Sequence, residues 1–171
     1  MFDSTKKHVV AESSKLIATY GGAHIYNLID KTSDIDNGKL LVRGELEPGY
    51  DQTYKALTPS EGDTDLVLVL NPPLIYEEYT SMCQAEYNFY NAAGTILRCY
   101  SLVKGDVFTV STEGITPADV NAGPVVGNHV TADGRDIKEV TTKPNTGFVG
   151  KIIEKVVQTN GFMYRIEVLA N

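Results

Sequence analysis

The sequence has few of the residues that build metal centres and disulfide frameworks. It contains no tryptophan, two cysteines and three histidines. His8, His24 and His129 lie far apart, and none has a second ligand at a metal-site spacing, so we expect no metal and no other cofactor. Cys83 and Cys99 are too distant for a Cys-x-x-Cys motif, and two thiols form no framework. We expect half-buried, reduced side chains, and the sequence leaves open whether they pair.

Positive charge and long apolar runs are also scarce. The formal net charge is −7, with a sequence pI near 4.9. Duplex nucleic-acid binding needs clustered Lys and Arg, so nucleic acid and anionic membranes are not expected partners. No apolar run approaches the ~20 residues that cross a bilayer. The first residues lack the apolar stretch of a signal peptide, which favours folding in a cytosol-like compartment.

The motifs of common enzyme classes are missing as well. The chain has no nucleophile elbow, no P-loop and no Gly-x-Gly-x-x-Gly fingerprint. Asp34–Gly38 resembles a calcium loop only superficially. With Gly38 at the obligatory sixth position, Ser33 would be first, and Gly44 would replace the bidentate Glu. We therefore predict that the chain is not an enzyme, although a triad assembled in space stays open.

Two Asn-Gly pairs predict β-hairpins, because glycine supplies the positive φ that such turns need. Asn37-Gly38 separates the apolar segments 24–29 and 39–46. Asn160-Gly161 separates 152–158 from 162–169, where Phe162, Tyr164, Ile166 and Val168 recur with the period of two typical of a strand with one buried face.

Three further features complete the expected elements. Leu66–Leu70 is apolar throughout and stops at two prolines, which favours a strand buried on both faces. Segments 86–90, 95–100 and 107–111, joined by Gly-containing turns, predict a three-stranded meander. Leu74–Met82 is the one helix candidate.

These patterns predict a mainly β fold, a small β-barrel or sandwich with Gly-rich loops, an extended N-terminal arm and at most one short helix. We divide the chain into an N-terminal arm (1–16), a β lobe with the meander (17–112) and a smaller Gly-rich, barrel-like lobe (113–171). Whether the two lobes pack as one domain stays open.

Candidate interface residues come from the arm and from the tyrosine-rich centre. The segment around Lys6 and Lys7 lacks a core pattern, so we expect it to be mobile in the free protein. Val9 and Val10 begin a short apolar piece suited to adding a strand to a neighbour's sheet edge. Tyrosine suits interfaces and strands equally, and the ten tyrosines therefore leave both interpretations open. The interface candidates are Lys6, Lys7, Val9, Val10, Tyr76 and Tyr79.

The order of several motifs resembles head decoration (cement) proteins of tailed bacteriophages. The resemblance covers roughly residues 20 to 112, and the Gly-rich remainder is similar in style only. It rests on Gly-Gly-Ala-His-Ile-Tyr-Asn-Leu (21–28), Asp-Asn-Gly (36–38), Leu-Asn-Pro-Pro (70–73), Phe-Tyr-Asn-Ala-Ala-Gly (89–94), Arg-Cys-Tyr-Ser-Leu (98–102) and Lys-Gly-Asp-Val-Phe-Thr-Val (104–110).

The resemblance implies a structural virion protein, made in the host bacterial cytoplasm, that binds the capsid exterior and stabilises contacts between capsomers. Its implied partner is the major capsid protein, and association with itself as a homo-oligomer such as a trimer is a further expectation. A phage tail, baseplate or receptor-binding β module is an alternative. A small β-barrel enzyme or ligand carrier is another, and it would require a deep pocket with converging polar groups.

Overall fold

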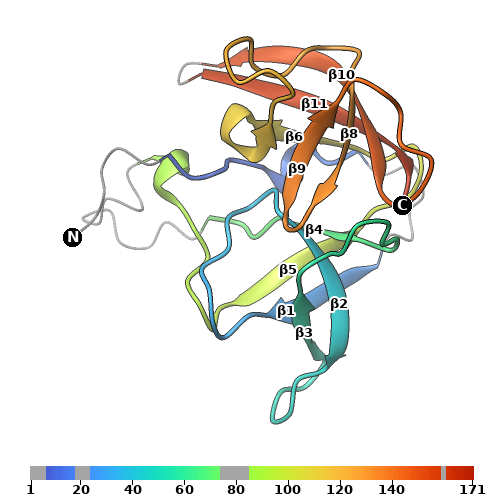
Figure 1. Ribbon diagram of the computed structural model, residues 1–171. Helices are drawn as coiled ribbons and strands as arrows, with labels where there is room; N and C mark the ends of the chain where they lie inside the picture. The colour runs from blue at the N-terminus through green and yellow to red at the C-terminus, as the bar shows by residue number, and fades with distance from the viewer. Residues whose placement is uncertain (1–6, 18–23, 74–84, 159–160) are drawn as a thin grey trace.

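The computed structural model describes residues 7–17, 24–73, 85–158 and 161–171. Strands form a closed barrel and a separate six-stranded sheet that lie one above the other in Figure 1. Helix is limited in these residues to short 3₁₀ turns, η1 (Ser13–Lys15), η2 (Glu86–Asn88) and η3 (Thr112–Gly114). The predicted mainly β class, with little helix and an extended N-terminal segment, is confirmed. The helix candidate Leu74–Met82 lies outside the described residues.

The barrel closes in the order β1-β3-β2-β4-β5, with β1 and β3 parallel. Its strands are β1 (Ile25–Ile29), β2 (Leu40–Leu46), β3 (Thr53–Leu57), β4 (Val67–Val69) and β5 (Ile96–Ser101). Gly38 has the expected positive φ of 81°, and its N–H donates to the carbonyl of Val69. The hairpin predicted around it is nevertheless wrong. The turn leads from β1 into β2, but β2 pairs with β3 and β4, and β3 lies between β1 and β2.

The second sheet has the order β6-β11-β10-β8-β9-β7. Its strands are β6 (Val107–Ser111), β7 (Ile115–Thr116), β8 (His129–Asp133), β9 (Asp136–Val140), β10 (Val149–Gln158) and β11 (Gly161–Ala170). The hairpin predicted at Asn160-Gly161 is confirmed, since β10 and β11 pair from Gln158–Gly161 to Val149–Ala170. Gly161 takes a φ of 143° there.

The predicted meander does not form. Glu86–Asn88 is a 3₁₀ turn rather than a strand. β5 pairs with β1 and β4 inside the barrel, whereas β6 pairs with β11 in the other sheet. Period-two patterns identify strands but do not select partners, and here the short turn at Lys104-Gly105 carries the chain from one sheet to the other.

β4 lies between the two hydrophobic cores. Alternate side chains of a strand point to opposite faces, and both faces of this one are covered. Val67 and Val69 pack in the barrel core, while Leu66, Leu68 and Leu70 pack in the core beneath the six-stranded sheet. The prediction of a strand buried on both faces is therefore confirmed, and the strand connects the two layers.

A polar link joins the same two layers. Arg135, in the turn between β8 and β9, donates to Asp30 (2.6 Å), Ser33 (2.9 Å) and Thr58 (2.9 Å) of the barrel lobe. Burial by itself raises the pKa of Asp30, but hydrogen bonds from Thr32, Ser33 and Arg135 outweigh that effect and hold the pKa well below its ordinary value. Asp30 is thus an ionised acceptor that fixes the β8–β9 turn against the barrel.

Cys99 faces the barrel core as a free thiol. Burial raises its pKa, so the thiol is protonated and unreactive. Cys83, the other cysteine of the chain, lies outside the described residues.

Candidate binding surface

The N-terminal segment is extended but it is not free. The amide of His8 donates to the carbonyl of Tyr87, and the amide of Ser111 donates to that of Val10. Isolated bridges join Ala11 to Val110 and Ile17 to Val107. Strand addition was the expected behaviour of this segment, but the edge that it covers is β6 of its own chain.

Val9 packs inside the protein rather than on its surface. It is 4% exposed and belongs to the core beneath the six-stranded sheet. A Cβ on Gly114 would lie 2.6 Å from Val9 Cγ1, and one on Gly38 would lie 3.1 Å from it. Two glycines therefore make the space that Val9 fills. The expectation that this part of the chain has no core to join is wrong, and Val9 is not available to a partner.

His8 attaches the N-terminal segment to Asp36 and Tyr90. Its Nδ1 lies 2.7 Å from Asp36 Oδ1, and its ring stacks on Tyr90 at 4.9 Å. The second carboxylate oxygen of Asp36 accepts from the Val9 amide at 3.2 Å. Asp36, which the sequence placed in a turn, thus also holds the N-terminal segment against the barrel lobe.

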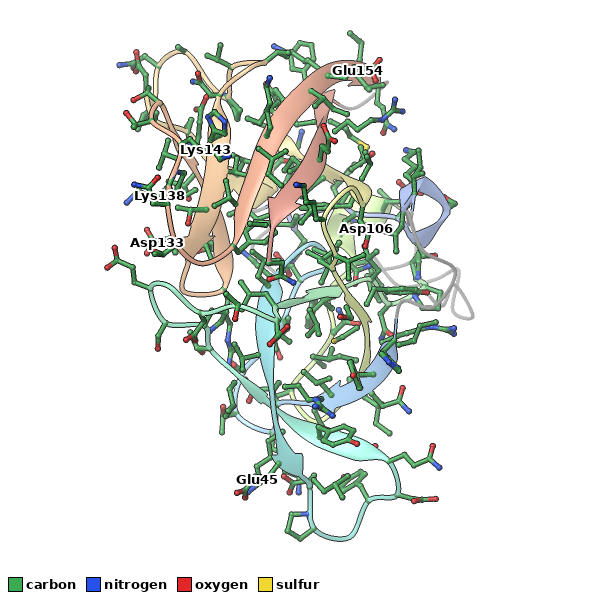
Figure 2. All side chains as sticks on the ribbon, turned by 90° about the vertical axis from the view of Figure 1, so that its right-hand side faces the viewer. Glu45, Asp106, Asp133, Lys138, Lys143 and Glu154 are labelled. Carbon is green, nitrogen blue, oxygen red and sulfur yellow. The ribbon has the colours of Figure 1, made fainter. Side chains whose placement is uncertain are left out.

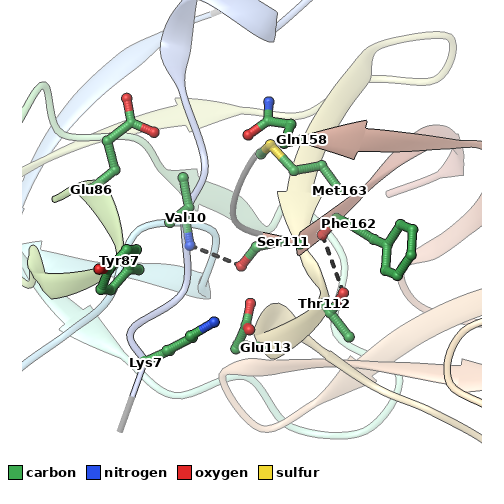
Figure 3. A pocket seen from close by; sticks show the side chains of 11 residues that line it. Lys7, Val10, Glu86, Tyr87, Ser111, Thr112, Glu113, Gln158, Phe162 and Met163 are labelled. Atoms are coloured by element: carbon green, nitrogen blue, oxygen red, sulfur yellow. Dashed lines mark hydrogen bonds between the residues drawn. The ribbon is translucent and has the colours of Figure 1, made fainter. Parts of the chain in front are cut away.

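Lys7 and Val10 line a cavity of about 270 Å³ between this segment, β6 and the β10–β11 hairpin. In Figure 3, the Lys7 side chain extends toward Glu113, and Met163 closes the opposite side. The Lys7 ammonium also lies 5.6 Å from the centroid of the Tyr87 ring. The remaining lining residues are Glu86, Ser111, Thr112, Gln158, Gly161 and Phe162. The other interface candidates, Lys6, Tyr76 and Tyr79, lie outside the described residues.

The β10–β11 hairpin continues past the core and carries an apolar face into solvent. Tyr164, Ile166 and Val168 are buried as the period of two predicts. Phe162, the next residue on that face, is 44% exposed, and its cross-strand partner Val157 is 76% exposed. Lys155 lies over the Phe162 ring at 3.9 Å and covers part of it. We refer to Lys155, Val157 and Phe162 as the hairpin surface.

The side of β10 that faces away from β11 is only partly paired. β8 covers Val149–Lys151, and Ile152 exchanges hydrogen bonds with the loop at Gly127 and Asn128. Beyond a bulge near Ile153, no strand within the described ranges pairs with residues 153–158 on that side. An exposed edge with apolar side chains is a ready template for another chain.

Sequence reasoning missed this surface. The Asn-Gly signal located the hairpin, but the pattern placed Phe162 with the core. A strand pattern gives the face on which a residue lies. It does not tell how far the opposing core extends along the strand.

Comparison with known proteins does not assign the chain to any group. No protein-family model, no curated protein and no solved structure matches it. Among the described residues, no helix is both long enough and apolar enough to span a membrane.

Proposed function

We propose that the chain is a structural virion protein that binds the outer surface of a phage capsid and stabilises contacts between capsomers. The observation that carries the proposal is the hairpin surface together with the open edge of β10. It is combined with the motif order that resembles head decoration proteins. The partner is the major capsid protein.

The hairpin surface has the properties of a protein-binding site. Val157 and Phe162 form a directly opposed apolar pair at the end of a rigid two-stranded ribbon. Interfaces are enriched in aromatic side chains, and a few such anchors supply most of the binding free energy. The N–H and C=O groups of residues 153–158 that point away from β11 have no strand partner among the described residues, and they offer main-chain hydrogen bonds to an added strand.

The cavity next to the hairpin extends the same surface. Phe162 and Gln158 belong both to the hairpin and to the cavity lining, and Lys7 and Val10 form the other wall. A capsid segment that pairs with the hairpin would therefore also meet a hollow with one lysine and two glutamates. This arrangement supports contact over an extended surface by a partner protein.

Cosedimentation with expanded shells of the encoding phage tests the proposal. The unmodified protein should pellet with the shells. Val157→Lys and Phe162→Ala should each weaken binding by about tenfold or more, because each removes an apolar anchor. Ile96→Lys, on the barrel strand β5 and 45% exposed in the unmodified chain, is the matched control and should bind normally.

Three results would contradict the proposal. If the unmodified protein does not pellet with the shells, capsid decoration is wrong. If it pellets with isolated tails or baseplates instead, the tail-module alternative is correct. If Ile96→Lys weakens binding as much as Val157→Lys does, the hairpin is not the contact.

A small-molecule carrier is the second candidate, and the cavity is the observation that favours it. Its 270 Å³ lies just below the ~300–1,000 Å³ typical of small-molecule sites. Native mass spectrometry of the purified protein distinguishes the two. A stoichiometric small ligand that Met163→Trp excludes would support a carrier, and a ligand-free mass is expected for a structural protein.

A further inference from the structure

A second, separate group of side chains lies at one end of the barrel. Tyr26 on β1, Tyr54 on β3 and Arg43 on β2 come from three adjacent strands. Tyr26 precedes Leu28 by two residues, and Arg43 follows Leu41 by two, so both continue the face that lines the barrel core. Tyr54 lies opposite Leu28 in the parallel β1–β3 pair. The group therefore covers the end of the core.

The arginine lies against both tyrosine rings. Arg43 Cζ lies 4.6 Å from the centroid of Tyr26 and 4.9 Å from that of Tyr54. The rings meet each other edge to face, 6.0 Å apart, and His24 stacks on Tyr26 at 5.8 Å. Cation–π contacts of this kind fix the position of a guanidinium without using its N–H groups.

The donors of Arg43 remain available. Arg135 donates to Asp30, and Arg165 donates to Glu154. Arg43 is exposed, and within the part of the chain that the structure describes it makes neither a hydrogen bond nor an ion pair. Glu45, two residues further along β2, forms no hydrogen bond with it. A guanidinium carries five N–H donors in a planar fork, so a set of oriented donors faces solvent here.

We propose that Arg43, packed against Tyr26 and Tyr54, is a binding site for a carboxylate, supplied by an Asp or Glu side chain of a partner protein. The planar fork matches a carboxylate in a bidentate pair. The rings hold the guanidinium in place before binding, which reduces the side-chain entropy lost on association. Tyr and Arg are also the residue types most enriched at the energetic centres of protein interfaces.

A protein carboxylate fits this site better than a phosphate polyanion. The chain carries a net charge of −7, and an extended polyanion would be repelled by it. Arg98, on β5, is the second arginine of the barrel strands. Its Cζ lies 5.8 Å from the centroid of a different ring, that of Tyr100. A single oriented guanidinium suits a single carboxylate.

The site is independent of the proposed capsid contact. In Figure 2, Glu45, which neighbours Arg43 on β2, and Glu154 on β10 lie at opposite ends of the molecule. The carboxylate site therefore belongs to a second surface, and it does not require that the hairpin bind a capsid.

Side-chain NMR of the full chain tests the proposal. The probe is a short blocked peptide with one glutamate, and the control probe is the same peptide with glutamine, both at constant ionic strength. The Arg43 Nε–Hε signal should shift saturably with the glutamate peptide and remain in place with the glutamine peptide. The Arg98 signal serves as an internal control and should not saturate.

Two variants test whether binding needs the guanidinium group of Arg43 or only its positive charge. Arg43→Lys keeps the charge but loses the fork, so peptide affinity followed on the Tyr26 and Tyr54 ring signals should fall at least about fivefold. Arg98→Lys should leave the affinity unchanged. If Arg43→Lys binds as tightly as the unmodified protein, or if the Arg43 signal never saturates, the proposal is wrong. Saturation by inorganic phosphate at the same concentrations would overturn the choice of a carboxylate.

Discussion

The barrel and the six-stranded sheet of this protein differ in whether they have strand edges. The barrel closes on itself in the order β1-β3-β2-β4-β5, so each of its strands has two neighbours. The six-stranded sheet is open. Its β6 edge is covered by residues 10–17 of the N-terminal segment, while no strand of the described ranges pairs with the part of β10 that runs beyond β8 on the side away from β11.

The closed barrel and the open sheet therefore offer a partner different kinds of surface. A closed barrel has no free edge to offer to another strand, and its exposed feature is a side-chain group, Arg43 packed against two tyrosines. An open sheet needs its edges protected. This one covers β6 with its own chain, and no described strand covers the far part of β10. The barrel presents a side-chain group, and the sheet presents a strand edge.

Leu68→Ala tests whether the two lobes unfold together. Leu68 on β4 is fully buried in the core beneath the sheet, and its truncation should lower the free energy of unfolding by about 3 kcal/mol. Because β4 also carries Val67 and Val69 of the barrel core, chemical denaturation should show one transition for both lobes. Two separate transitions would show that the barrel folds without the sheet.

Gly114→Ala tests the protection of the β6 edge. The added Cβ would lie 2.3 Å from Val110 Cγ2 and 2.6 Å from Val9 Cγ1. Relief of the contact with Val9 requires displacement of the N-terminal segment, so we expect a loss of about 2 kcal/mol in unfolding free energy. The double variant Val9→Ala/Gly114→Ala removes that contact, and Val9→Ala alone is its reference. If Gly114→Ala destabilises the reference as much as it does the unmodified protein, the contact with the N-terminal segment is not the cause.

Acid unfolding tests the polar link between the lobes. The pKa of Asp30 is lowered in the folded protein from an ordinary value of 3.8. The stability that this carboxylate contributes is therefore fully present above about pH 4 and is lost as the pH falls toward the folded pKa. Urea denaturation followed from pH 6 to pH 2 should show that decline, and it should be shallower in Asp30→Asn. Equal slopes in both proteins would contradict this role.

Val157→Lys should have the smallest effect on the isolated protein. Its side chain is 76% exposed, so the free energy of unfolding should change by no more than about 0.5 kcal/mol. Ile152→Ala, on the buried part of the same strand, is the contrast and should cost about 2 kcal/mol or more. A large loss in Val157→Lys would mean that the hairpin surface supports the fold rather than serving recognition.

Patterns local in sequence were predicted well. The class, the doubly buried Leu66–Leu70 strand and the β10–β11 hairpin depend on residue alternation and on glycine at a turn, both of which are written in adjacent residues. The hairpin at Gly38 and the meander were wrong for one reason. Pairing between strands depends on contacts distant in sequence, and a positive-φ turn is compatible with several destinations of the chain.

The candidate sites show the same division. Lys7 and Val10 were selected from the sequence and do line the cavity, whereas Val9, selected with them, is buried. A polar, unpatterned segment gave no sign that Gly38 and Gly114 leave space for one of its valines. Nor did the abundance of tyrosine indicate that two tyrosine rings would pack against Arg43.

The sequence by itself determined the mainly β class, the acidic charge and the turn chemistry, because these depend on composition and on nearest neighbours. Tertiary structure alone decided which edges are covered, where the core ends along β11, and that Arg43 lies against two tyrosine rings. Those properties arise from the meeting of segments about 100 residues apart, such as Val10 with Ser111 and Asp30 with Arg135. Exposure is set by what lies opposite a residue, and the neighbours of that residue in the chain do not contain this information.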